Sequence, residues 1–262
     1  MFLEVNNVSK SFADKDRGTF EVFSNIDLAI KENQFVSLLG PSGCGKSTLL
    51  SMVAGLESVT EGTIQLDGQN IIKAGPDRGM VFQQPSLFPW LNVKENVMFP
   101  LKQIISRQEA SERADHFLKM VHLSRFKNHY THELSGGMQQ RVAIARALAM
   151  DPKVLLMDEP FGALDEQTRH ILHKELMKIF QETQKTILFV THSIQEAIKL
   201  SDRVVVMGTR PGRIMADFQV DLTRPRMRDD EQVIALERKV MDLLESEIDK
   251  VLKDELSHEN IH

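Results

Sequence analysis

Residues 35–54 read FVSLLGPSGCGKSTLLSMVA, and they are the strongest indication of the fold in this sequence. A short apolar run leads into a glycine-rich turn, and a second apolar segment with helical spacing follows. Glycines let backbone N–H groups surround an anion because no Cβ atoms are in the way, and the N-terminus of the next helix adds a positive partial charge. Segment 40–47 also matches the phosphate-binding pattern G-x-x-x-x-G-K-[ST]. The stretch therefore predicts a strand, a phosphate-binding loop and a helix.

Each part of the loop has an expected role. The helix is expected to begin near Thr48, and the alternative of a glycine-rich turn with a chance lysine conflicts with the flanking strand and helix. Lys46 is expected to neutralise β- and γ-phosphates, and the Ser47 hydroxyl is expected to coordinate Mg²⁺. Cys44 stands at a free position of the pattern, so we interpret it as incidental. The residues assigned to the phosphate loop are Gly40, Pro41, Ser42, Gly43, Cys44, Gly45, Lys46, Ser47 and Thr48.

Composition limits the kinds of partner. The chain has 262 residues, 42% of them hydrophobic, which suits a folded globular protein. A net charge of -5 gives no basic field for binding phosphate backbones, so we expect no nucleic acid partner. A single cysteine and the lack of a signal-like start favour a reducing cytoplasm. The apolar runs fall far short of the roughly 20 residues that cross a bilayer, so any membrane span is expected on another chain.

Further apolar runs predict more of the fold. Buried, mostly parallel strands are expected at Phe35 to Leu39, Met80 to Phe82, Val154 to Met157, Ile187 to Val190 and Val204 to Met207. Helical patterns lie between them, and the clearest begins at Ser106, where Glu109 completes a capping box. This alternation predicts an α/β fold. Residues 99–149 have helical spacing without a convincing strand, which indicates a helical insertion.

An acidic pair, Asp158 and Glu159, ends one predicted strand. Open α/β sheets bind ligands at the carboxyl ends of their strands, so Asp158 is our Mg²⁺ ligand, directly or through water. Glu159 is expected to reach a water in line with the γ-phosphate, as a general base or orienting group. Such pairs are often structural, and the upstream phosphate loop is what favours catalysis here.

Residues 134–141, LSGGMQQR, resemble the signature motif of ATP-binding-cassette (ABC) ATPases. Ser135, Gly136 and Gly137 can begin a helix and present hydroxyl and backbone donors to an anion. The resemblance implies that this helix end, together with Gln139, binds the γ-phosphate of a nucleotide held by a second subunit. Two such sites would form across a head-to-tail homodimer.

The resemblance covers nearly the whole chain and implies further roles. Gln83 would contact Mg²⁺ and the attacking water, and so join Ser47 and Asp158 in the metal site. His192 would contact the γ-phosphate, and Asp165, in the GALD loop, would couple the two sites.

Three positions leave alternatives open. Phe12 matches the aromatic residue that stacks on adenine, but Phe20 and Phe23 are nearby competitors, and Phe12 taken alone reads as a core aromatic. His192 taken alone reads as a buried structural histidine. Ser193 follows it where aspartate is usual in the family, which puts the contacts that support the histidine in doubt.

The implied fold is a P-loop NTPase (ABC ATPase) core. It would be α/β, with a parallel sheet, an N-terminal antiparallel β part and an inserted helical subdomain. We expect the ATP-binding domain over residues 1–226, with the helical subdomain at about 99–149, and a C-terminal amphipathic helical tail over residues 227–262. The tail residues that keep helical spacing are Val240, Leu244, Ile248 and Val251.

Finer resemblance points to importers. Segments 87–91 (LFPWL), 159–165 (EPFGALD) and 210–214 (RPGRI) are similar to the subfamily that imports nitrate, sulfonates and taurine in bacteria. This implies an ATPase with ATP and Mg²⁺ as cofactors, at the cytoplasmic face of the inner membrane. Its partners would be integral-membrane permease subunits and, indirectly, an extracytoplasmic solute-binding protein. The alternatives are a soluble ABC ATPase acting on DNA, ribosomes or Fe–S assembly, and a scaffold, which would be expected to lack Glu159 or His192.

The only tryptophan, Trp90, stands in an unusually apolar loop. Connecting segments normally lie on the surface in water, so something is expected to cover this loop. One candidate is the protein's own core. The other is a short cytoplasmic helix of the permease, seated in a groove.

Overall fold

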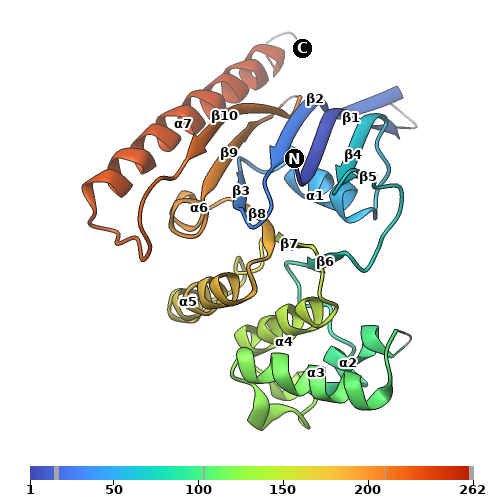
Figure 1. The fold of residues 1–262 in the computed structure, drawn as a ribbon. Coiled ribbons are helices and arrows are strands. Elements are labelled where there is room, and N and C mark those ends of the chain that lie inside the picture. Colours follow the sequence, from blue (N-terminus) through green and yellow to red (C-terminus); the bar gives the residue numbers. More distant parts are fainter. Residues whose placement is uncertain (15–17, 103, 210, 260–262) are drawn as a thin grey trace. The chain divides into compact units, whose positions relative to one another are not determined.

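The computed structural model (Figure 1) describes residues 1–14, 18–102, 104–209 and 211–259. The chain divides into two compact units, Met1–Ala74 with Leu188–His262, and Gly75–Ile187. Both units combine strands with helices, so the predicted α/β fold is confirmed. The domain bounds 1–226 and 227–262 and the helical subdomain at 99–149 stay predictions.

The first unit holds two groups of strands. An antiparallel sheet has the order β2-β1-β4-β5 and consists of β1 (Leu3–Asp14), β2 (Gly18–Ile30), β4 (Glu61–Leu66) and β5 (Gln69–Asn70). The other group has the order β10-β9-β3-β8 and consists of β3 (Phe35–Leu39), β8 (Thr186–Thr191, in this unit from Leu188), β9 (Arg203–Gly208) and β10 (Arg213–Gln219). Strand β3 runs parallel to β9, whereas β10 is antiparallel to it. The bounds of β3 match the prediction, and β8 and β9 extend the predicted runs by one residue at each end.

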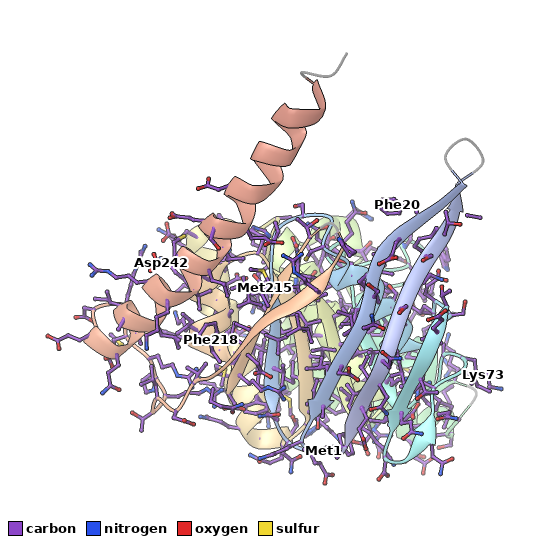
Figure 2. The ribbon with its side chains drawn as sticks, turned by 90° about the horizontal axis from the view of Figure 1, so that it is seen from above. Met1, Phe20, Lys73, Met215, Phe218 and Asp242 are labelled. Atoms are coloured by element: carbon purple, nitrogen blue, oxygen red, sulfur yellow. The ribbon has the colours of Figure 1, made fainter. Side chains whose placement is uncertain are left out.

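In the described part of this unit, the helices are α1 (Lys46–Ala54), α6 (Ile194–Leu200) and α7 (Glu231–Glu259). Helix α7 lies beside β10 in both views (Figures 1 and 2). Its Val240 is fully buried in one cluster with Val206 of β9 and Ile198 of α6. Figure 2 shows Phe218 of β10 on one side of α7 and Asp242 on the other. The tail is thus an amphipathic helix packed on β9 and α6, although the side chains of Ile248 and Val251, and Arg210 of the RPGRI segment, lie outside the described residues.

A buried arginine fixes the segment that leads into α7. The Arg226 guanidinium donates hydrogen bonds to the carbonyl oxygens of Ile198, Ser201, Val220 and Leu222. Two of these carbonyls belong to the end of α6, where helical carbonyls have no partner within the helix. Burial lowers the pKa of Arg226 to about 10, so the group stays charged at neutral pH.

In the second unit, the strands β6 (Arg78–Val81) and β7 (Val154–Asp158) run parallel to each other. Its α-helices are α2 (Val93–Met98), α3 (Arg107–Met120), α4 (Gly136–Ala149) and α5 (Glu166–Thr183), and its short 3-10 helices are η1 (Phe99–Leu101), η2 (Ser124–Phe126) and η3 (Thr131–Glu133). The capping box predicted from Ser106 and Glu109 begins α3. Within the described ranges, no helix has the length and apolar character needed to cross a membrane.

Candidate functional site

The phosphate loop owes its shape to two glycines. Gly43 and Gly45 have φ angles of 81° and 93°, in the left-handed region that residues with a Cβ atom rarely adopt. Gly45 is the N-cap of α1, and its carbonyl accepts a hydrogen bond from Leu49 N at 2.8 Å. The helix therefore begins at Lys46, two residues before the predicted start.

The Lys46 side chain spans the loop. Its ammonium donates hydrogen bonds of 2.8 Å to the carbonyl oxygens of Gly40 and Pro41, and the residue is buried. Ser47 is exposed in the first turn of α1, which suits a hydroxyl expected to meet a metal ion. Burial raises the pKa of the Cys44 thiol, so the thiol is neutral at physiological pH and a reactive thiolate is disfavoured.

The three aromatic candidates occupy different environments. Phe23 is fully buried, and a Cβ atom added to Gly45 would lie 2.5 Å from its ring. Phe23 therefore packs directly against Gly45 of the loop. Phe12 and Phe20 face each other in the β1–β2 register and are 41% and 60% exposed. The Lys10 ammonium lies 4.5 Å from the centroid of the Phe12 ring. Phe12 is thus an accessible aromatic, and the interpretation of it as a core residue is wrong.

His192 follows the end of β8 and is exposed, so the interpretation of it as a buried structural histidine is wrong. Ser193 is the N-cap of α6 and accepts a hydrogen bond from Glu196 N at 3.3 Å. Its own N–H donates to the Thr191 hydroxyl at 3.0 Å. Serine therefore fills the helix-capping role that the family's usual aspartate can also fill. In the sheet, β8 lies next to β3, the strand that leads into the phosphate loop.

In the second unit, two neighbouring strands end in candidate residues. Val81 pairs with Met157 in the parallel β6–β7 register, so the carboxyl ends of both strands meet at one edge. Gln83 follows β6, and Asp158 and Glu159 lie at the end of β7. The edge thus carries one amide and two carboxylates, which supply the hard oxygen atoms that Mg²⁺ prefers.

Glu159 has a φ angle of 42°, an uncommon value for a residue other than glycine. Such conformations persist where the surrounding structure enforces them, and they cluster at functional sites. A Cβ atom placed on Gly162 would lie 3.5 Å from Gln83 Nε2 and 3.7 Å from Glu159 Oε2. Both candidate side chains therefore converge beside Gly162.

The signature residues begin α4 as expected. Ser135 is the N-cap, and its hydroxyl accepts a hydrogen bond from Met138 N at 3.4 Å. A Cβ atom on Gly137 would clash with Cγ2 of Thr168 on α5. Gly136 has more room, since its nearest neighbour, Leu164 Cδ2, is 3.6 Å from such a Cβ atom. The Ser135 hydroxyl is exposed at the helix N-terminus, where an anion is stabilised.

Two adjacent glutamines have different partners. The Gln139 amide donates to the Thr131 carbonyl at 3.0 Å, which holds the segment before α4. Gln140, which the sequence analysis did not single out, is buried and donates to the Phe82 carbonyl at 3.2 Å. It thereby fixes the backbone next to Gln83. No sequence signal separates Gln140 from Gln139, the polar residue before it on α4.

Asp165 is the N-cap of α5, and its carboxylate accepts a hydrogen bond from Thr168 N at 2.9 Å. Hydrogen bonds from Thr168 hold the pKa of Asp165 below the usual value. The bond from the Thr168 side chain has the largest effect, and the bond from its backbone N–H comes next. Arg169 donates to the carbonyls of Phe161 and Leu164, which fixes the loop before the helix.

The Trp90 side chain is 69% exposed, so the interpretation that the protein's own core covers it is wrong. Its ring lies 5.4 Å from that of Phe88, which lies 4.4 Å from that of Phe99. The buried Asn96 holds this loop, because its side chain bonds both the N–H and the carbonyl of Phe88 and the carbonyl of Leu91. A rigid loop therefore displays an aromatic surface.

Comparisons with known proteins show the family of the chain. A profile of the ABC transporter family matches residues 23–162. An uncharacterized ABC transporter ATP-binding protein of Methanocaldococcus jannaschii is 50% identical over 96% of this chain and 94% of its own length. The nitrate import ATP-binding protein NrtD of Synechocystis sp. is 49% identical over 85% of this chain and 84% of its own length. The aliphatic sulfonates import ATP-binding protein SsuB of Bacillus cereus is 44% identical, with coverages of 94% and 96%.

A solved structure extends the likeness to the fold. A dimeric ATP-binding cassette in a post-hydrolysis state, bound to ADP and phosphate, has a TM-score of 0.75 at 36% identity and covers 85% of this chain and 100% of its own. The phosphate loop, the acidic strand end and the signature helix thus occur in a chain whose sequence and fold both match one family. The chain belongs to the ABC transporter family, as an ATP-binding and ATP-hydrolysing cassette.

Proposed function

We propose that the chain powers the import of a small solute such as nitrate, a sulfonate or taurine through a separate membrane permease. The observation that carries ATP binding is the loop geometry, in which Gly43 and Gly45 are left-handed and the Lys46 ammonium crosses the loop. The identities of 49% and 44% to nitrate and sulfonate import proteins support the solute class. Nitrate and sulfonates are small oxyanions, and the permease rather than this subunit would contact the solute.

ATP would be held mainly through its phosphates. Lys46 and the N–H groups of the loop bind phosphate oxygens, while Phe12 stacks on adenine. Ser47, Asp158 and Gln83 each carry an oxygen atom of the kind that Mg²⁺ prefers, and this ion when bound would neutralise charge on the β- and γ-phosphates. Among the described residues, no group of three or more His, Cys, Asp or Glu side chains forms a metal cage.

Hydrolysis would depend on Glu159, Gln83 and His192. Glu159 accepts a proton from the attacking water, Gln83 orients that water, and His192 contacts the γ-phosphate. Glu159→Gln should keep ATP binding but lower turnover by about 100-fold or more, the size of general-base catalysis. Steady-state ATPase assays and nucleotide titration would measure this, with the exposed Glu182→Gln as a control. Turnover close to that of the wild type would remove Glu159 from the mechanism.

Each complete site would use two chains. Lys46 and Ser135 act on one nucleotide only when they come from different subunits of a head-to-tail homodimer. A mixture of Lys46→Ala and Ser135→Arg subunits then contains dimers with one doubly altered site and one unaltered site. Recovery of ATPase activity on mixing two inactive proteins would support this arrangement. Mixed dimers as inactive as either parent would contradict it.

The aromatic loop around Trp90 would bind the permease, which would hold the subunit at the cytoplasmic face of the inner membrane. The solute-binding protein would meet the permease and not this chain. Because Trp90 is largely exposed, Trp90→Ala should change the free energy of unfolding by no more than about 0.5 kcal/mol. It should leave the basal ATPase intact and abolish assembly with the permease. Ile72→Ala, at an exposed apolar residue of the other unit, is the matched control.

A further inference from the structure

Helix α7 buries a carboxylate that ATP binding does not explain. The Glu247 side chain is 2% exposed, and its Oε2 atom lies 2.8 Å from Nη2 of Arg213. Its Oε1 atom accepts a hydrogen bond from Thr209 N at 3.0 Å. Burying a charged group is unfavourable unless it is paired and hydrogen-bonded, so these two bonds define the site.

Thr209 lies in the turn between β9 and β10, of which Thr209, Pro211 and Gly212 are described, and Arg213 is the first residue of β10. Arg213 closes the network, because its Nη1 atom donates to the Thr209 carbonyl at 3.1 Å and to the Pro211 carbonyl at 3.4 Å. A Cβ atom on Gly208 would lie 2.5 Å from Glu247 Oε1, so only glycine admits the carboxylate this closely. Glu247 and Arg213 therefore hold the backbone of the turn through hydrogen bonds at Thr209 and Pro211.

The β9–β10 turn also packs against the phosphate loop. A Cβ atom on Gly40 would clash with the carbonyl of Met207, and one on Gly212 would clash with the carbonyl of Cys44. Gly212 N also donates to the Val22 carbonyl at 2.8 Å. The two segments touch backbone to backbone at both ends of the turn, and a shift of the turn must move the loop.

We propose that Glu247 is a positioning residue of the ATP site, which acts through the β9–β10 turn on the phosphate loop. This inference rests on the proposed role of that loop in binding ATP. Without the carboxylate, Thr209 N and Arg213 lose their shared acceptor, and the turn no longer supports the loop backbone at Gly40 and Cys44. Docking of the C-terminal helix thereby sets the affinity for ATP.

The only cysteine of the chain gives a direct probe. Cys44 is fully buried in the phosphate loop, and its carbonyl contacts the turn at Gly212. Without nucleotide, Glu247→Ala should raise the rate of Cys44 alkylation by N-ethylmaleimide about tenfold, as expected for the loss of hydrogen bonds to a charged group. The exposed Glu245→Ala, on the same helix, should keep the wild-type rate.

Lower stability alone has to be separated from loosening of the loop. Leu66→Ala removes core volume in β4, away from the turn, and serves as a destabilised reference. Alkylation of Glu247→Ala should be faster than that of Leu66→Ala when both are measured equally far below their melting temperatures. An alkylation rate equal to that of the wild type or of this reference would overturn the inference.

ATP kinetics provide the second readout. Glu247→Ala should raise KM for ATP about tenfold and leave kcat within about twofold, because the loop is loosened but the hydrolytic groups are intact. Glu247→Gln keeps an acceptor for Thr209 N and should fall between. Lys46→Ala tests the loop itself: if it leaves the Kd for ATP unchanged in calorimetric titration, the proposed ATP role of the loop fails. If Lys46→Ala raises this Kd but Glu247→Ala raises neither Kd nor KM for ATP, the positioning role of Glu247 fails.

Discussion

Two helices of this protein begin with glycine-rich segments, the phosphate loop before α1 and the signature segment before α4, and they use glycine for different reasons. Gly45 has a φ angle of 93°, and α1 has no side-chain cap. The φ angle of Gly137 is not positive, so its backbone conformation does not require glycine. A Cβ atom at Gly137 would clash with the side chain of Thr168. The first segment needs the backbone freedom of glycine, whereas the second needs its small size.

The difference extends to what each helix end can bind. Gly45 has no side chain that could accept a hydrogen bond from the first N–H groups of α1, so no cap at this residue would compete with the phosphate that we propose for this helix end. In α4, Ser135 satisfies one N–H group through a long bond to Met138 and keeps its hydroxyl exposed. The start of α1 therefore offers backbone N–H groups, whereas the start of α4 is a capped helix end with one exposed polar side chain.

Gly45→Ala should give the largest effect. An alanine in the left-handed region costs about 1–2 kcal/mol, and its clash with Phe23 adds about 1–3 kcal/mol. Urea unfolding should show both losses together, and calorimetric titration should show that ATP binding is lost. The double variant Gly45→Ala/Phe23→Leu, which removes the ring, should regain only the stability that was lost through the clash. Full recovery in that double variant would mean that size, not backbone freedom, is what Gly45 provides.

Gly137→Ala should be less severe and fully reparable. Overpacking against Thr168 costs about 1–3 kcal/mol in the free energy of unfolding. Thr168→Ser removes the clashing methyl group but keeps the hydroxyl, and the next atom, Thr168 Cβ, would be 3.8 Å away. The double variant should be at least as stable as Thr168→Ser alone, because alanine forms helix better than glycine. A double variant no more stable than Gly137→Ala would contradict the steric explanation.

The glycine-rich segments before α1 and α4 also show what could be predicted from the sequence. The strand Phe35–Leu39 was predicted with its observed bounds, and the start of the helix after the loop was predicted to within two residues, because local spacing and apolar runs encode them. The contact of Gly137 with Thr168 and the bond from Gln140 to Phe82 were not predicted, since both join residues far apart in the chain. Which polar side chain is buried, and against which carbonyl, depends on tertiary packing.

Variants at Ser135 separate capping from anion binding at α4. Ser135→Ala loses the cap and should cost about 1 kcal/mol of stability. Ser135→Asp restores a capping acceptor but places a negative charge where phosphate would bind, so it should keep stability and lose ATPase turnover. Thermal unfolding and ATPase assays on both variants test this. Normal turnover in Ser135→Asp would show that this helix end does not meet phosphate.

The smallest effect at neutral pH is expected at α5, which begins with the carboxylate cap Asp165 instead of glycine. Its pKa is held below the usual value of about 3.9 by hydrogen bonds from Thr168. A carboxylate with a lowered pKa in the folded state stabilises the fold fully above its unfolded-state pKa, and this contribution disappears as pH falls through the folded value. Asp165→Asn cannot titrate, and asparagine caps a helix about as well as aspartate.

The variant should therefore match the wild type closely near neutral pH and lose less stability than the wild type as the pH falls below about 4. Urea unfolding followed by circular dichroism at both pH values measures the two differences. Glu166→Gln, at the next residue of the same exposed turn, controls for the removal of a charge alone. Equal acid sensitivity of Asp165→Asn and the wild type would show that the Thr168 hydrogen bonds do not stabilise the ionised cap, and the difference between a charged and a glycine cap would then rest on geometry alone.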